Sequence, residues 1–129
     1  MSVLNIAATK STPQIHFDDK QDLLEIQGES YPENTPNFYA PIFAWLEEYL
    51  QQVGERAVTM NLEINYFNSS SSKVLTDLFD RLDEACRSGT PIVVNWRYHE
   101  ENDMALEYGE DFQEEVEEIT FNLIEFSDD

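Results

Sequence analysis

Apolar and polar residues alternate over the segment 57–67, which is the clearest strand pattern in the chain. The apolar residues of one parity are Val58, Met60, Leu62, Ile64 and Tyr66. Successive side chains of a strand point to opposite faces of a sheet, so this pattern predicts a strand whose buried face includes Tyr66. Shorter apolar runs bounded by turn residues predict four further strands, at 13–17, 22–28, 92–98 and 119–126.

A different pattern, with apolar residues at three- and four-residue steps, predicts a helix over about 36–53. Asn34 or Thr35 can cap its start, and Pro36 suits the first turn because that position needs no N–H donor. A glycine follows the last apolar residue and is placed to end the helix. The segment 28–36, which contains one glycine and two prolines, is predicted to interrupt regular structure.

Two further helices are predicted later in the chain. One covers about 72–87 and follows a run of four serines, and Gly89 and Pro91 lie just past its end. The other, around 102–116, has a weaker pattern because Gly109 interrupts it. A strand–helix–strand unit implies a right-handed crossover between parallel strands. The first two strands are joined by a short polar turn and are predicted to form a hairpin.

The resulting order, β-β-α-β-α-β-α-β, predicts an α/β fold with a mixed sheet and helices packed mainly on one face. A chain of 129 residues with 41% hydrophobic residues has the size and composition of one domain, which we expect to span 1–129. Four large aromatic residues fall on periodic apolar faces and are expected in the core, namely Trp45, Tyr66, Phe79 and Trp96.

The charge of the chain is extreme, since 27 acidic and 7 basic side chains give a formal net charge of −20. Such a surface repels phosphate backbones and anionic lipids, so we expect no nucleic-acid and no membrane partner. Cys86 is the only cysteine, which excludes an intrachain disulfide and fits a reducing cytosol. The sequence shows no signal-peptide pattern and no run of the ~20 apolar residues that span a bilayer, so a cytoplasmic protein is expected.

Acidic residues are concentrated in the segment 100–129, which has thirteen of them and no lysine or arginine. Like charges on the third predicted helix repel each other, and glutamates near its C-terminus oppose the helix dipole. This cost indicates either low local stability or a cationic partner. Asp18 and Asp19 lack the rest of a calcium-loop pattern, and we expect no metal and no cofactor.

Asn68 and the serines that follow it are predicted to lie where the long strand ends and the second helix begins. Hydroxyls at such a place commonly cap the unpaired N–H groups of a helix, which is the ordinary structural explanation. The same N–H groups and the partial positive charge of the helix start would also suit a phosphoryl group. Lys73 could neutralise part of a phosphate's charge of about −1.5 to −2, so the fold could tolerate phosphorylation.

Three segments of the chain carry a resemblance to a known family. They are YFNSSSSK at 66–73, GESYPEN at 28–34 with the aromatic residues that follow it, and the segment 91–98 with its tryptophan. In this order they resemble the SiaC family of bacterial regulatory phosphoproteins. The order of the elements also resembles STAS domains such as the anti-sigma-factor antagonists, in which a serine at the start of a helix is switched in the same way.

The resemblance implies a non-enzymatic phospho-switch. Family members are phosphorylated by a dedicated serine/threonine kinase and dephosphorylated by a PP2C-like phosphatase. An unphosphorylated member binds and activates a diguanylate cyclase, which raises cyclic-di-GMP and promotes aggregation or biofilm. The modified residue follows the asparagine and is commonly threonine; in this chain it is Ser69, with Ser70 as the alternative, and its surroundings are Asn68, Ser71, Ser72 and Lys73.

Other interpretations of these residues stay open. The segment 28–34 can cap one end of the sheet or form part of a partner surface, in which case the contacts would come from Glu29, Tyr31, Glu33 and Asn34. A small enzyme could use Glu29, Glu33 or Ser70 in an acidic pocket, and an acidic decoy could bind basic proteins by charge alone. The two histidines, His16 and His99, show no spacing that would build a Ser-His-Asp site. The free protein is expected to be a monomer.

Overall fold

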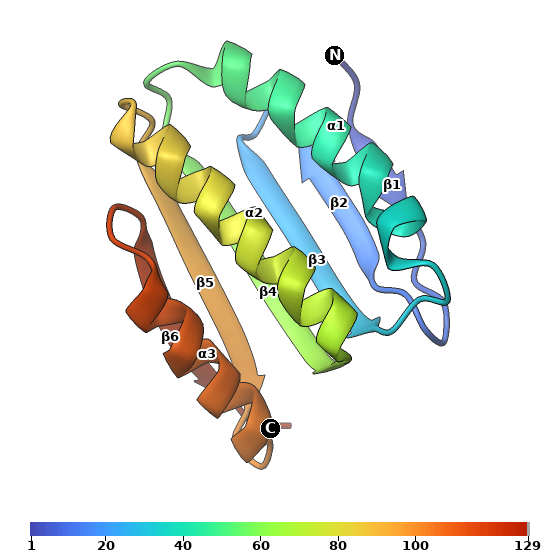
Figure 1. Ribbon diagram of the computed structural model, residues 1–129. Coiled ribbons are helices and arrows are strands. Elements are labelled where there is room, and N and C mark those ends of the chain that lie inside the picture. The colour runs from blue at the N-terminus through green and yellow to red at the C-terminus, as the bar shows by residue number, and fades with distance from the viewer. Residues whose placement is uncertain (129) are drawn as a thin grey trace.

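All strands in residues 1–128, the part of the chain that the computed structural model describes, form one six-stranded sheet (Figure 1). They are β1 (Leu4–Ile6), β2 (Gln14–Asp18), β3 (Leu23–Ser30), β4 (Val58–Phe67), β5 (Ile92–His99) and β6 (Thr120–Phe126). The strands stand in the sheet in their chain order. β1 pairs antiparallel with β2 and β2 with β3, whereas β3 to β6 run parallel. The predicted mixed sheet and its hairpin are therefore confirmed.

Three helices lie on the same face of this sheet (Figure 1). They are α1 (Thr35–Val53), α2 (Ser69–Arg87) and α3 (Asp103–Glu115). Every parallel connection is a crossover that steps in the same direction along the sheet, and crossovers of one hand then bring all helices to one side. The predicted packing of helices on one face is confirmed. Among the helices of residues 1–128, none combines the length and the apolar character needed to cross a bilayer.

The core lies between the helical layer and the sheet. Trp96 of β5 is fully buried in it, next to Phe79, and its Nε1 donates a hydrogen bond of 2.9 Å to the carbonyl of Ala105 in α3. Gly109 allows α3 to approach this closely, because a Cβ at that position would lie 2.5 Å from Cδ1 of Trp96. The glycine that weakens the helical pattern of the sequence is therefore required by packing.

No helix of residues 1–128 covers the opposite face of the sheet (Figure 1), and polar side chains lie on it. Asn61, Asn95 and Asn122 occupy one register row across β4, β5 and β6, and amide hydrogen bonds of 2.9 and 3.0 Å join them. In the neighbouring row Arg97 donates to Glu63 at 2.7 Å. Polar side chains on this face thus pair across strands instead of packing against a second layer.

The alternation of β4 breaks near its end. The register passes from Gly28 opposite Ile64 to Glu29 opposite Tyr66, so Asn65 is an extra residue that forms a β-bulge. Beyond the bulge the two faces of the strand exchange, and Tyr66 is 51% exposed. The prediction that Tyr66 belongs to the core is therefore wrong, because one inserted residue reverses a pattern with a period of two.

Three further features differ from the sequence-based prediction. The strand β1 is absent from that prediction because three residues are too few to show alternation, so the observed order begins with one additional strand. β3 continues to Ser30, beyond the predicted break, since its backbone pairs with β4 as far as Phe67. Trp45 is only partly buried, and its Nε1 donates to the carbonyl of Ser2 at 2.7 Å.

The carboxylate of Asp83 in α2 anchors the loop that leads from α3 to β6. It accepts hydrogen bonds from the backbone N–H groups of Glu117, Glu118 and Ile119 at 3.0, 2.7 and 3.0 Å. Burial raises the pKa of Asp83, but these three donors together with Arg87 outweigh it, so the pKa lies below its ordinary value. The ionised carboxylate therefore holds an acidic loop in place.

We expect Asp83→Asn to lower the free energy of unfolding at neutral pH by about 1–3 kcal/mol, since three backbone N–H donors, one of them buried, lose a charged acceptor. The folded-state pKa is depressed, so this stabilisation is present above the unfolded-state pKa of about 3.9 and is lost as pH falls through the folded-state value. Urea unfolding measured from neutral to acidic pH should show the difference from wild type shrinking. Asp80→Asn, an exposed change on the same helix, serves as the control; a deficit that stays constant with pH would contradict the assignment.

Candidate functional site

The two segments singled out in the sequence, 28–34 and 66–73, meet at the carboxyl edge of the sheet. Ser30 stands opposite Phe67 in the parallel pair of β3 and β4. The N–H of Asn68 donates to the carbonyl of Ser30 at 3.1 Å, which continues the pairing past the end of β4. Residues that lie about forty positions apart in the chain are thereby placed side by side.

Asn68, and not a serine, is the N-cap of α2. Its backbone is extended, and its side-chain Oδ1 accepts from the N–H of Ser71 at 2.9 Å. Its carbonyl accepts from the N–H of Ser72 at 2.9 Å, so the helix begins at Ser69. The prediction that the serines precede a helix starting near 72 is corrected: they form the first turn. An asparagine cap leaves the hydroxyls of the first turn free for other contacts.

One serine of the run is locked inside the protein. Ser71 is fully buried, and its Oγ lies 2.8 Å from Oγ of Ser30, which in turn lies 2.6 Å from the hydroxyl of Tyr39 in α1. We call these three residues the hydroxyl triad. Burial raises the pKa of Tyr39, although its bond to Ser30 opposes this, so the phenol stays protonated. The triad joins β3, α1 and α2 and removes Ser71 from the residues that an enzyme could modify.

Ser69 and Ser70 are exposed, whereas Ser72 is half-buried. Two residues along a helix turn the side chain by about 200°, so Ser69 lies about 160° around the axis from the buried Ser71 and faces outward. Within residues 1–128, no hydrogen-bond partner is found for the backbone N–H of Ser69 or of Ser70. An exposed hydroxyl thus stands beside unpaired N–H donors, as a phosphoryl group would require.

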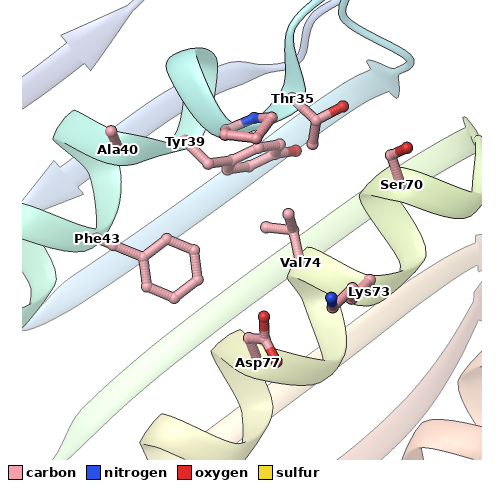
Figure 2. A pocket seen from close by; sticks show the side chains of 9 residues that line it. Thr35, Tyr39, Ala40, Phe43, Ser70, Lys73, Val74 and Asp77 are labelled. Carbon is pink, nitrogen blue, oxygen red and sulfur yellow. The ribbon is translucent and has the colours of Figure 1, made fainter.

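Ser70 faces a cleft between the N-terminal halves of α1 and α2 (Figure 2). The cleft has a volume of about 410 Å³ and apolar walls, chiefly Phe43 of α1 and Val74 of α2. The remaining lining residues are Thr35, Pro36, Tyr39, Ala40, Lys73 and Asp77. The sequence does not predict this cleft, because its two walls belong to helices separated by a strand. The available signal in the sequence was that Phe43 and Val74 lie at the margins of the apolar stripes of the two helices. In the structure both side chains are half-buried.

Lys73 is the basic side chain of this region. All four arginines in residues 1–128 form ion pairs with carboxylates, at Arg56, Arg81, Arg87 and Arg97. For Lys73 no ion pair is found within the same residues, and its side chain is exposed at the cleft (Figure 2). It follows Ser69 by four positions and Ser70 by three, and both spacings bring side chains together on a helix. Its ammonium group is therefore available to a phosphate on either serine.

The segment 28–34 has a structural role and an exposed surface at once. Asn34 is the N-cap of α1 and accepts from the N–H of Asn37 at 3.1 Å, which confirms one of the two predicted caps. Tyr31 packs edge-on against Tyr66, with ring centroids 5.6 Å apart. Glu33 is exposed and Glu29 is half-buried. Neither glutamate lines the cleft that Ser70 lines, so the three residues of the hypothetical acidic-pocket enzyme are not brought into one pocket.

The two histidines lie away from the serine run. Nδ1 of His16 contacts Oδ1 of Asn5 at 2.5 Å on the strand pair β1–β2. Nε2 of His99, at the end of β5, lies 3.1 Å from a carboxylate oxygen of Asp128. No serine–histidine hydrogen bond is found in residues 1–128, and no three metal-binding side chains gather within that range.

The fold and this site define a class: an α/β protein that presents an exposed hydroxyl at the start of a helix, beside an apolar cleft. The chain belongs to the SiaC family, because the model of the SiaC family regulatory phosphoproteins matches residues 6–126. This confirms the predicted family and a regulatory role in place of an enzymatic one. A relative from Pseudomonas aeruginosa strain UCBPP-PA14, an uncharacterized protein, is 37% identical over 115 residues, which is 89% of this chain and 90% of the relative.

Solved structures of SiaC from Pseudomonas aeruginosa have the same fold. One is 34% identical with a TM-score of 0.85 and covers 98% of this chain and 99% of its own. The crystal structure of apo-SiaC has a TM-score of 0.83 at 34% identity, with 97% and 98% covered. A third, SiaC in the crystal structure of the diguanylate cyclase SiaD in complex with its activator SiaC, has a TM-score of 0.85 at 34% identity, with 96% and 98% covered. The likeness to STAS domains stays a prediction.

Removing the central hydroxyl of the triad by Ser30→Ala should destabilise the fold by about 2 kcal/mol, because two buried hydroxyls, on Ser71 and Tyr39, lose their partner. Urea unfolding at pH 7 measures this loss. The matched control is Ser70→Ala, an exposed serine in the first turn of α2 next to Ser71, which should change the unfolding free energy by less than about 0.5 kcal/mol. Equal stability of the two variants would show that the triad does not hold the helix start.

Proposed function

We propose that this protein is a phospho-switch that acts in the cytoplasm, with residues 1–129 as one regulatory domain. A serine/threonine kinase phosphorylates Ser69, and a PP2C-like phosphatase removes the phosphate. The phosphorylation state controls binding and activation of a diguanylate cyclase, and through cyclic-di-GMP it controls aggregation or biofilm formation. Membership of a family of regulatory phosphoproteins supports this function, as does the similar SiaC that activates the cyclase SiaD.

The observation that carries the proposal is the different environment of neighbouring serines. Ser71 is fully buried in the hydroxyl triad, whereas Ser69 faces outward at the first residue of α2. A kinase needs an exposed hydroxyl, and the fold must tolerate the dianion that results. At Ser69 the helix start attracts negative charge and Lys73 lies one turn further along, so the fold can keep its structure. Ser70, also exposed, is the alternative acceptor.

The switch acts through a local change of charge and hydration. A phosphate adds about −1.5 to −2 charge and three acceptor oxygens to a chain whose net charge is −20. The added group lies at the junction of the segment 28–34, the cleft between α1 and α2, and the start of α2. A partner that covers this junction would have to desolvate the dianion, and the single charge of Lys73 does not balance it, so the desolvation is costly. Release of the partner then needs no refolding of the domain.

Ser69→Ala should abolish phosphate incorporation by the cognate kinase, because the acceptor hydroxyl is gone while α2 keeps its asparagine cap. Incorporation is measured with the purified kinase and intact-protein mass spectrometry, and wild type should reach one phosphate per chain. Ser72→Ala, a half-buried position of the same turn, is the control and should be labelled fully. Full labelling of Ser69→Ala with loss in Ser70→Ala would move the acceptor by one residue.

Ser69→Asp should weaken binding to the cyclase by about tenfold or more, because the partner must desolvate the carboxylate; tenfold corresponds to about 1.4 kcal/mol. Ser69→Ala should bind as wild type does. Surface plasmon resonance measures the affinities, and circular dichroism should show the same helix content in all three proteins. Equal binding by the alanine and aspartate variants would rule out the charge mechanism, even if the kinase phosphorylates the wild-type protein normally.

A further inference from the structure

Large apolar side chains are exposed at few places in residues 1–128, and several of them gather on one surface. Tyr66 is 51% exposed, Met104 61% and Tyr108 36%. All three line a cleft of about 70 Å³ between the end of β4 and the start of α3. Tyr31 extends this surface through its edge-on contact with Tyr66. We call Tyr31, Tyr66, Met104 and Tyr108 the aromatic patch.

The aromatic patch stands on a fixed base. The ring of Tyr108 packs on the buried ring of Phe67, with centroids 4.6 Å apart. The side-chain amide of Asn102 donates to the carbonyl of Asn65 in the bulge at 3.0 Å, which ties the start of α3 to β4. Gly109 presses the next turn of α3 against the core. A surface held in this way needs little ordering when a partner binds, and such pre-organisation favours affinity.

Acidic side chains surround the aromatic patch. Asp103 and Glu107 are exposed and neighbour Met104 and Tyr108 on α3, and Glu29 stands opposite Tyr66 in the sheet. Solubility alone would be served as well by charges spread over the molecule. An apolar centre with a single-sign rim is instead complementary to a segment that is both apolar and basic.

We infer that the aromatic patch is the docking surface for a basic amphipathic segment of the partner protein. An aliphatic or aromatic side chain of that segment inserts between Tyr66 and Tyr108, and its lysines or arginines pair with Asp103 and Glu107. Tyrosine and methionine are well suited to this, because tyrosine supplies a large rigid contact and methionine adapts its shape. The inference rests on the proposed function, for which it names the surface that the effector contacts. Ser69 follows Tyr66 by three residues, so the docked segment would pass close to the proposed phosphorylation site.

A synthetic helical peptide with leucines on one face and lysines on its flanks is the probe. Fluorescence anisotropy should show that the double variant Tyr66→Ser/Met104→Ser binds it about tenfold more weakly than wild type does. The control is Ile124→Ser, because Ile124 is also exposed, at 39%, but lies on β6 beside the asparagine row of the uncovered sheet face. Binding that is equal in the double variant and wild type, or equally weakened in the control, would overturn the inference. Met104→Ala, which favours a helix, provides the same comparison should the double variant fail to fold.

The acidic rim has its own matched pair of variants. Asp103→Asn/Glu107→Gln should weaken peptide binding and reduce its dependence on salt. Glu48→Gln/Glu55→Gln removes the same charge from exposed positions on and after α1 and should leave both nearly unchanged. Equal effects of the two pairs would show that net charge alone attracts the peptide, which would overturn the docking surface.

The full-length diguanylate cyclase separates this inference from the proposed function. Loss of binding in the aromatic-patch variants, with normal phosphorylation of Ser69, would support both. Binding that is the same for wild type and for these variants would overturn the docking surface and leave the switch standing. A cyclase that fails to bind wild-type protein would overturn the proposed effector, and the peptide measurements would still decide the inference.

Discussion

The position of the serines in the first turn of α2 depends on one buried contact, the hydrogen bond between the hydroxyls of Ser30 and Ser71. A buried hydroxyl without a partner is costly, so these two residues must meet, and Tyr39 completes their hydrogen bonding. The contact fixes the first turn of α2 against the end of β3. Because Ser71 must point inward, the helical period turns Ser69 outward and directs Ser70 to the cleft. A structural requirement of the core thereby decides which hydroxyls the surface presents.

Most basic side chains near the sheet and helices are paired with carboxylates, whereas the acidic side chains are concentrated in and after α3. All four arginines of the described residues are used in ion pairs, which leaves Lys73 available beside Ser69, the proposed phosphorylation site. The acidic side chains of α3 and of the loop after it repel one another. The Trp96–Ala105 hydrogen bond holds the helix in place, and the hydrogen bonds to Asp83 hold the loop. These contacts keep the acidic side chains of α3 and its following loop at one side of the molecule. Two surfaces of different character then flank the start of α2: the apolar cleft and the acidic, aromatic patch.

Much of the fold could be predicted because its elements carry strong local patterns. The alternation in 58–64 and the two long apolar stripes identify β4, α1 and α2, and the order of the elements implies a parallel arrangement. The prediction was weakest where a tertiary contact overrides a local signal. Gly109 weakens the helical pattern but is needed against Trp96, and the bulge at Asn65 has no signature in the sequence. Resemblance identified the family, which patterns of polarity could not do.

By itself, the sequence determined the elements, the charge and the presence of a hydroxyl cluster beside an asparagine at a strand-to-helix junction. These are local properties, set by the spacing of apolar residues and by residue chemistry. Only the tertiary structure decided that Asn68 is the cap, that Ser71 is buried and Ser69 exposed, and that Tyr66 leaves the core to join Met104 and Tyr108. The reason is physical: burial and contact depend on which distant segments meet, and a shift of one residue in a strand or helix start changes the direction of every side chain that follows.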